Sequence, residues 1–249
     1  MDDFERQLAG LGVTADRIPL GRKSALDQQG YMVIPDLLDE LWLPPLRDLF
    51  ESEVTRHGEA TPGVVSHNKR ESGTRHVDQL EQHKVAINVC TSPEVLAAAY
   101  YLLKRRFRIT MMHGRDPLPG FGQQGLHRDW HIPKPGTVEI VTAIALLDPF
   151  TAENGATRVV AGSHIDPRPI GKRLSDPAYI HNSQVVIEAN QGSVLVFNGH
   201  LMHSATRNRS TGRRRTIQFS FVGFENRMRI METDRNLDKV DPNVRFLFE

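Results

Sequence analysis

Residues 214–222 read Arg-Arg-Thr-Ile-Gln-Phe-Ser-Phe-Val, so that polar and apolar side chains alternate along most of the segment. Because successive side chains of a β-strand point to opposite faces, this period predicts a strand with Ile217, Phe219 and Phe221 on one face. The polar residues form the other face. Extended backwards, the same period assigns Arg214 to the polar face and its two arginine neighbours to the opposite one.

Similar short segments precede this one in the chain. Turn-forming residues connect them, whereas parallel strands would need longer connections such as helices. This succession predicts an antiparallel sandwich or barrel, because alternating strands and helices would be typical of a parallel sheet. The expected strands cover residues 106–111, 138–147, 157–160, 185–187, 193–197 and 216–222.

The first part of the chain has the apolar spacing of amphipathic helices instead. We therefore expect one domain, residues 1–249, that is mainly β with N-terminal helices. Its mostly helical part, residues 1–105, would pack on a β core formed by residues 106–249. The expected N-terminal elements are helices over 24–29, 36–50 and 91–100, a short strand over 30–35 and a loop over 58–82.

The composition is that of an ordinary globular protein, with 249 residues, 39% apolar residues, 24% charged residues and a net charge of +1. So small a net charge favours neither nucleic acid nor an acidic membrane as a partner. The single Cys90 excludes an internal disulfide and a zinc site built from several thiolates. We find no signal peptide and no long apolar run, and therefore expect a cytoplasmic protein.

The motif His-x-Asp occurs three times, beginning at His76, His127 and His164. Together with a distant histidine it is the ligand pattern of the facial triad that holds Fe(II). On a strand, both side chains of the motif point to the same side and can reach one metal. We favour His127 with Asp129, and His203 as the third ligand, because this separation leaves room for the intervening strands. His164 lies in a turn and His76 precedes the β core.

Arg214 has the chemistry needed to bind a carboxylate inside the β core. Its guanidinium group can donate two parallel hydrogen bonds to a carboxylate, which a lysine cannot do. The residues alone leave a second interpretation open, in which segment 207–215 is a basic surface hairpin. Binding of nucleic acid by this segment is disfavoured, because no aromatic residues are interleaved with the arginines.

Three motifs follow one another in a fixed order: residues 127–130, residues 154–164, and residues 203–205 followed by Arg214. Together they resemble the phytanoyl-CoA dioxygenase-like family of Fe(II)/2-oxoglutarate-dependent oxygenases, and a weaker resemblance extends to residues 30–35. The similarity covers most of the chain. One departure is Ala161, where members of the family usually have a proline.

The resemblance implies a double-stranded β-helix, also called a jelly roll, of the cupin-like kind. It implies that His127, Asp129 and His203 hold Fe(II), and that 2-oxoglutarate chelates this metal as a cosubstrate together with O2. In the family, an arginine eleven positions after the distal histidine binds the far carboxylate of 2-oxoglutarate. That position is Arg214 here, the residue that the strand alternation also selects.

Two further cosubstrate contacts are implied by the resemblance. Gln124 and Thr157 match positions that hydrogen-bond 2-oxoglutarate in similar enzymes, with Gln123 as the alternative if the register differs by one residue.

The residues that contact the substrate are less constrained by the sequence. Trp130 and His131 directly follow the metal pair and could form a wall of the pocket. Met111 and Arg75 are further candidates, although Met111 is also expected, with His113, to belong to the core. Long irregular segments often close over active sites, and two such candidate lids are present. They are residues 59–78 and 166–182.

The expected function is hydroxylation of a small-molecule metabolite, with release of succinate and CO2. The same chemistry could instead desaturate, cyclise or epoxidise a substrate. Two alternative functions are a cupin-type metalloenzyme that does not use 2-oxoglutarate and a metal-free β-sandwich binding module. No nucleic-acid or membrane partner is expected, and the sequence predicts neither the identity of the substrate nor the oligomeric state.

Overall fold

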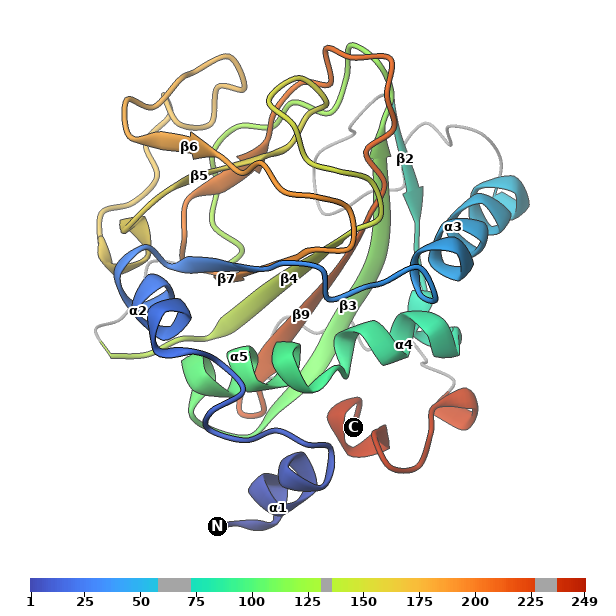
Figure 1. The fold of residues 1–249 in the computed structure, drawn as a ribbon. Helices are drawn as coiled ribbons and strands as arrows, with labels where there is room; N and C mark the ends of the chain where they lie inside the picture. The colour runs from blue at the N-terminus through green and yellow to red at the C-terminus, as the bar shows by residue number, and fades with distance from the viewer. Residues whose placement is uncertain (58–72, 131–135, 227–236) are drawn as a thin grey trace.

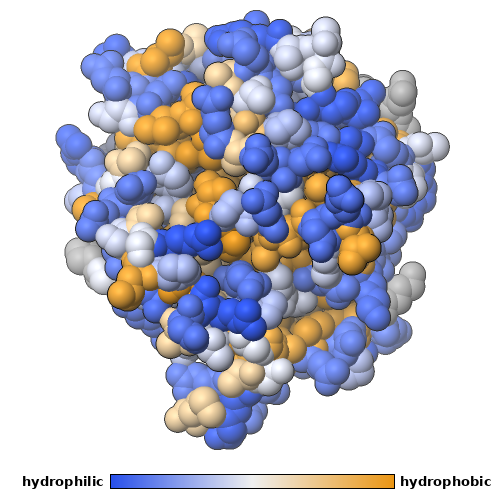
Figure 2. Space-filling model, in the orientation of Figure 1, coloured by the Kyte–Doolittle hydropathy of each residue, from blue (hydrophilic) through white to orange (hydrophobic). Residues whose placement is uncertain are grey.

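The structure of the protein is a computed structural model that describes residues 1–57, 73–130, 136–226 and 237–249. Two antiparallel β-sheets lie face to face, and helices cover the outer face of the larger one (Figure 1). Hydrophilic residues predominate on the face of the molecule drawn in Figure 2, with apolar residues visible between them.

The larger sheet has six strands in the order β1-β7-β4-β9-β3-β2. Every pair of neighbours in it is antiparallel, and β9 lies between β4 and β3 over its whole length. The strands are β1 (Tyr31–Ile34), β2 (Thr74–Val77), β3 (Phe107–Pro117), β4 (Ile140–Leu146), β7 (Val194–Asn198) and β9 (Thr216–Gly223).

The smaller sheet has three antiparallel strands in the order β6-β5-β8. They are β5 (Thr157–Val160), β6 (Gln184–Val186) and β8 (His203–Ala205). An isolated antiparallel bridge between His127 and His203 continues the pairing beyond β8.

The helices come mostly from the first part of the chain, as expected. Asp2 and Glu5 form a reciprocal capping box at the first helix, and Pro93 occupies the first turn of α5, where its missing N–H costs nothing. The elements are α1 (Asp3–Gly10), α2 (Leu20–Gln28), α3 (Leu43–His57), α4 (Lys84–Cys90), α5 (Pro93–Leu103), η1 (Leu80–Gln82), η2 (Ser163–Ile165), η4 (Leu237–Lys239) and η5 (Arg245–Leu247).

No single helix in the described ranges has the length and apolar composition of a membrane span. The bent pair α4 and α5 meets that test of length and composition when the two helices are taken together.

Side-chain alternation divides the core into two parts. Ile217, Phe219 and Phe221 share one face, as predicted, and this face points towards the helices, where it belongs to the large cluster formed with α3, α4 and α5. On β4, Ile144 and Leu146 point the other way and pack between the two sheets. The inner face of the large sheet is therefore the one that faces the small sheet.

The structure corrects the expectations for β2, η1 and β3. Part of the expected loop over 58–82 forms β2 and η1, because β2 pairs with the second half of β3. β3 itself continues to Pro117, and its register with β9 shifts between Ile109 and Met112. This irregularity interrupts the alternation, so Met111 is 48% exposed and is not a core residue.

The close approach of α3 to the large sheet generates the first prediction. A Cβ atom on Gly114 would lie 2.4 Å from a methyl group of Val77 and 2.6 Å from the Phe50 ring. Gly114→Ala should therefore lower the free energy of unfolding by about 1–3 kcal/mol, as overpacking in a core does. Gly21→Ala on α2, where nothing lies within 4 Å, is the matched control and should not destabilise. Urea unfolding of both variants checks this, and equal stabilities would contradict the packing described.

Candidate metal centre

Main-chain pairing brings two distant segments of the chain together at the candidate site. The main-chain N–H of His127 donates to the carbonyl of His203 over 2.9 Å, and that of His203 donates back to the carbonyl of His127 over 2.9 Å. The N–H of Asp129 donates to the Gly199 carbonyl over 2.9 Å. The His-x-Asp motif is thus fixed alongside the segment that leads into β8.

The side chains of these three residues converge. Oδ1 of Asp129 lies 3.4 Å from Nε2 of His203 and 4.0 Å from Nε2 of His127. Each residue offers a ligand atom, and these atoms lie within 4.8 Å of one another, the one such group found among the described residues. His164 is placed elsewhere, with Nε2 at 3.1 Å from the Asp27 carbonyl.

Hydrogen bonds orient all three side chains towards a shared point. Nδ1 of His127 lies 2.9 Å from the Gly125 carbonyl, and Nδ1 of His203 lies 2.9 Å from the Leu201 carbonyl. Because a carbonyl only accepts, each Nδ1 carries a proton, and each Nε2 presents a lone pair when its ring is neutral. Thr142 donates to Oδ2 of Asp129 over 2.6 Å, which leaves Oδ1 directed at the imidazoles.

The protonation of the three groups reflects their mutual proximity. Burial acts to raise the pKa of Asp129, but the neighbouring His203, His127 and Thr142 lower it on balance. Burial acts to lower the pKa of His203, but the carboxylate of Asp129 raises it on balance. Burial and the charge of His203 lower the pKa of His127 to about 4. At neutral pH the site therefore holds an ionised carboxylate and a neutral His127.

This donor set fits Fe(II). Two imidazole nitrogens and one carboxylate oxygen on one side of a point are the ligands of the facial triad, which leaves three coordination positions open. A zinc site built on thiolates is incompatible with it, since Cys90 is buried on α4.

Arg214 lies in the core between the two sheets, as the alternation along β9 predicts. Its side chain is 3% exposed, and its guanidinium carbon lies 5.5 Å from the centre of the Phe150 ring. Thr157 on β5 is 3% exposed and shares its face with Val159, which also packs between the sheets. Because β5 pairs Thr157 with Ala205, this hydroxyl lies one strand from the end of β8.

The structure distinguishes the two glutamines. Gln124 pairs with Ala205 on β8: its N–H donates to the Ala205 carbonyl over 3.1 Å, and its Oε1 accepts from the Ala205 N–H over 3.2 Å. Gln123 instead contacts Pro177 and Arg207 in more exposed surroundings. Gln124 is therefore the glutamine beside the strand that carries His203.

The candidate substrate residues do not gather at the site as a group. Trp130 is half-buried directly after Asp129, and His131 lies outside the described residues. Arg75 bonds Asp116 over 3.2 Å on the face of β2 that points towards the helices. Met111 is exposed at the irregularity in β3.

Sequence reasoning missed three polar residues on the inner face of the β2–β3 pair. His113 and Arg115 lie on β3 beyond the register shift, and His76 on β2 pairs with Arg115. Burial and the charge of Arg115 lower the pKa of His76 to about 4, and burial, Arg115 and His76 lower that of His113 to about 3. The alternation of His113 and Arg115 around Gly114 indicates that these two side chains share one face of the strand. Because of the irregularity in β3, the sequence alone does not show that this is the inner face.

Two arginines, the half-buried Arg128 and the buried Arg158, attach the second candidate lid to the site. Arg128, between two of the candidate ligands, donates to the carbonyls of Ser163, Asp166 and Arg168. Arg158 donates to the carbonyl of Tyr179 over 2.7 Å. It also donates to the Gln124 carbonyl over 3.0 Å, so it joins the lid segment to the residues that pair with β8.

Comparison with known proteins places the chain among oxygenases. The family described as Phytanoyl-CoA dioxygenase (PhyH) matches residues 26–216. The uncharacterized protein Rv1501 of Mycobacterium tuberculosis is 28% identical over 221 residues, which cover 80% of this chain and 74% of that protein. Dioxygenase trt7 of Aspergillus terreus is 25% identical over 213 residues, which cover 79% of this chain and 71% of that protein.

Solved structures share the fold. The non-heme alpha-ketoglutarate-dependent carbocyclase SnoK from nogalamycin biosynthesis superposes with a TM-score of 0.67 at 20% identity, covering 84% of this chain and 86% of that one. HygX from Streptomyces hygroscopicus, with nickel, 2-oxoglutarate and hygromycin B bound, gives 0.65 at 18% identity, covering 83% and 88%. These likenesses confirm the expected jelly-roll, cupin-type fold.

The different pKa values of the two histidines predict how metal affinity depends on pH. A metal must displace any proton on its ligands, and only His203, whose pKa is raised, carries one between the two histidine pKa values. In that range the affinity for Ni(II) should fall about 10-fold for each unit of decreasing pH, as for one displaced proton. Calorimetric titration of the metal-free protein at several pH values measures this slope. A fall of about 100-fold per unit would mean that both histidines titrate together and would contradict the assignment.

Proposed function

The chain belongs to the phytanoyl-CoA dioxygenase family and is an Fe(II)- and 2-oxoglutarate-dependent oxygenase, and on that basis we propose that His127, Asp129 and His203 hold its iron. The convergence of their three ligand atoms within 4.8 Å is the observation that carries this proposal. Asp129 supplies the negative charge, and the two imidazoles bind through Nε2 because their Nδ1 atoms are engaged by carbonyls.

We propose that 2-oxoglutarate lies between the metal centre and Arg214. Bound Fe(II) would supply the activation of O2 that drives oxidation of the substrate, with 2-oxoglutarate converted to succinate and CO2. Arg214 would bind the far carboxylate through two parallel hydrogen bonds, in a core that excludes water. Gln124, in the segment that pairs with β8, and Thr157 on β5 would hydrogen-bond the same cosubstrate.

The proposed reaction is hydroxylation of a small-molecule metabolite. Family membership and the bound hygromycin B of HygX support a small molecule as substrate, and SnoK, a carbocyclase, illustrates ring formation as an alternative outcome on this fold. We further propose a cytoplasmic location, because the single cysteine, Cys90, is a free thiol, as suits a reducing compartment.

We propose that the substrate contacts the inner face of β3 and Trp130. His113 lies opposite Gln218 on β9, and its pKa reflects the charge of Asp129, so this imidazole is close to the metal centre. The uncharged imidazole of His113 and the amide of Gln218 can hydrogen-bond hydroxyl or carbonyl groups of a substrate, and the guanidinium group of Arg115 on the same face can bind an acidic group.

Turnover of 2-oxoglutarate without substrate tests the assignment of cofactor and ligands. The wild type with added Fe(II) should produce succinate, and Asp129→Ala should abolish it. Arg214→Lys should raise the KM for 2-oxoglutarate at least about 10-fold while leaving Fe(II) binding within about 2-fold, because a point charge does not reproduce the paired fork. Metal binding without any production of succinate would favour the cupin-type metalloenzyme, and undiminished turnover by Arg214→Lys and Arg214→Ala would remove Arg214 from the cosubstrate site. No metal binding at all would favour the metal-free binding module.

A screen of metabolites by thermal stabilisation, with 2-oxoglutarate and Zn(II) present, tests these substrate contacts. A metabolite that raises the Tm of the wild type should lose most of this effect in His113→Leu, because a leucine cannot hydrogen-bond it. Met111→Leu on the exposed side of the same strand is the matched control and should keep the full effect. Equal stabilisation of both variants would remove His113 from the substrate site.

A further inference from the structure

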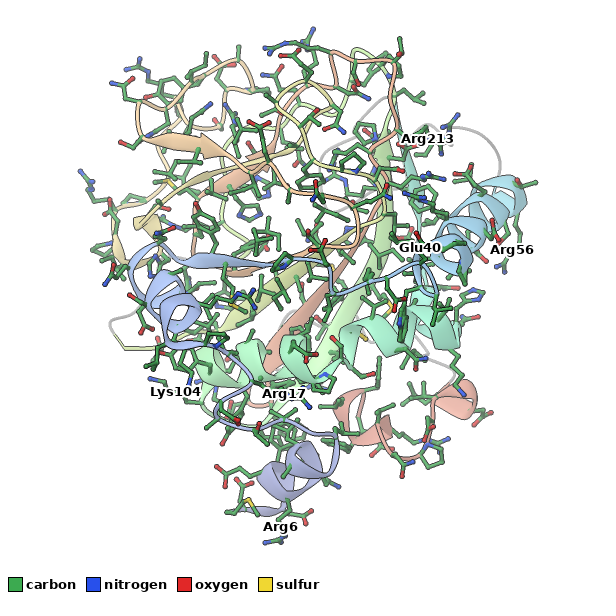
Figure 3. All side chains as sticks on the ribbon, viewed as in Figure 1. Arg6, Arg17, Glu40, Arg56, Lys104 and Arg213 are labelled. Carbon is green, nitrogen blue, oxygen red and sulfur yellow. The ribbon has the colours of Figure 1, made fainter. Side chains whose placement is uncertain are left out.

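Three consecutive arginines precede β9, and only the middle one lies between the sheets. We propose that Asp116 and Asp148 are positioning residues that set the affinity for 2-oxoglutarate by fixing Arg214 in this inward orientation. This inference rests on the proposed role of Arg214 as the residue that binds the far carboxylate. Figure 3 labels Arg213 beside β2 and above α3.

Asp116, near the end of β3, binds the main chain of Arg214 and the side chain of Arg213. Its Oδ1 accepts from the main-chain N–H of Arg214 over 3.1 Å, and its Oδ2 accepts from Nε of Arg213 over 2.7 Å. Arg75 reaches the same Oδ2 over 3.2 Å. Asp116 is only 1% exposed, so water competes little with these charge-assisted bonds.

Asp148, just after β4, binds both the main chain and the side chain of Arg215. Its Oδ2 accepts from both the main-chain N–H and Nε of Arg215, each over 2.8 Å, and its Oδ1 accepts from Nη2 of Arg215 over 2.8 Å. Burial acts to raise the pKa of Asp148, but these bonds to Arg215, together with the charge of Arg47, lower it on balance. The carboxylate is therefore ionised at neutral pH.

Glu51 on α3 binds both outer arginines, Arg213 and Arg215. Its Oε1 accepts from Nη2 of Arg213 over 2.7 Å and from Nη1 of Arg215 over 2.8 Å. Three carboxylates thus hold the two outer arginines on the helix side. The middle residue is turned to the opposite face, as the two-residue period of an extended chain requires.

These carboxylates act where the strand ladder ends. The pairings of β9 with β3 and β4 begin at Thr216, so Arg214 lies two residues before the first paired residue of β9. The main-chain N–H of Arg214 instead donates to the side chain of Asp116 on β3. A slip of one residue in an extended segment exchanges its two faces, and here it would present Arg213 or Arg215 to the core instead. The aspartates oppose that slip, because either outer arginine would lose its ion pairs.

The experiment compares binding of 2-oxoglutarate with that of 2-oxobutyrate, which has the same metal-chelating end but no far carboxylate. Calorimetry on the full chain loaded with Zn(II) gives the ratio of the two dissociation constants. In Asp116→Ala and Asp148→Ala this ratio should shift about 10-fold against 2-oxoglutarate, the size typical of lost support for a binding residue, with 2-oxobutyrate and Zn(II) binding unchanged. Asp116→Asn should shift it less, since its amide oxygen can still accept from the Arg214 N–H.

Glu51→Gln provides a variant that should fold, because this side chain is 43% exposed, and a shift in the same direction is expected. Glu94→Gln, which breaks the separate ion pair with Arg17, is the matched control and should leave the ratio unchanged. An unchanged ratio in all the Asp116, Asp148 and Glu51 variants would overturn this inference alone. Failure of the wild type to bind 2-oxoglutarate, or equal binding by Arg214→Gln, would overturn the proposed function and this inference with it.

Discussion

The candidate site depends on a pair of main-chain hydrogen bonds between His127 and His203. The two residues are far apart in the sequence, and neither lies in a long strand. Their reciprocal bonds bring both imidazoles to one side, with ring centres 4.5 Å apart, and the motif geometry then adds the carboxylate of Asp129. The rest of the β core supports this bridge: Phe197 packs against His203 with its ring centre 4.5 Å away, and Thr142 orients Asp129 from the neighbouring strand.

The large sheet separates two kinds of environment. Its helix side holds the aromatic and aliphatic core and, near the end of β3, the ion pairs formed by Asp116, Asp148 and Glu51. Its inner side holds the metal centre and Arg214. Charges on the helix side compensate one another locally, which is how three successive arginines are accommodated beside a buried site without adding all their positive charge to it.

Much of this could be predicted from the sequence, because a two-residue period survives wherever a strand is regular. The period of β9 gave both its apolar face and the inward position of Arg214, and the His-x-Asp motif pointed to the region of the site. The irregularity in β3 broke this rule, so Met111 was expected in the core and His113 was not expected near the metal. β2 escaped notice because its four residues carry mixed polarity, and only its pairing with β3 makes it a strand.

The way Arg128 and Arg158 hold the segment after β5 has a consequence for how this enzyme could diversify. Both guanidinium groups bind that segment largely through main-chain carbonyls, which every amino acid possesses. Substitutions along residues 166–179 would therefore keep the anchoring intact while altering what the segment presents to its surroundings. Such a segment can change its sequence over evolutionary time while its attachment to the β core stays unaltered.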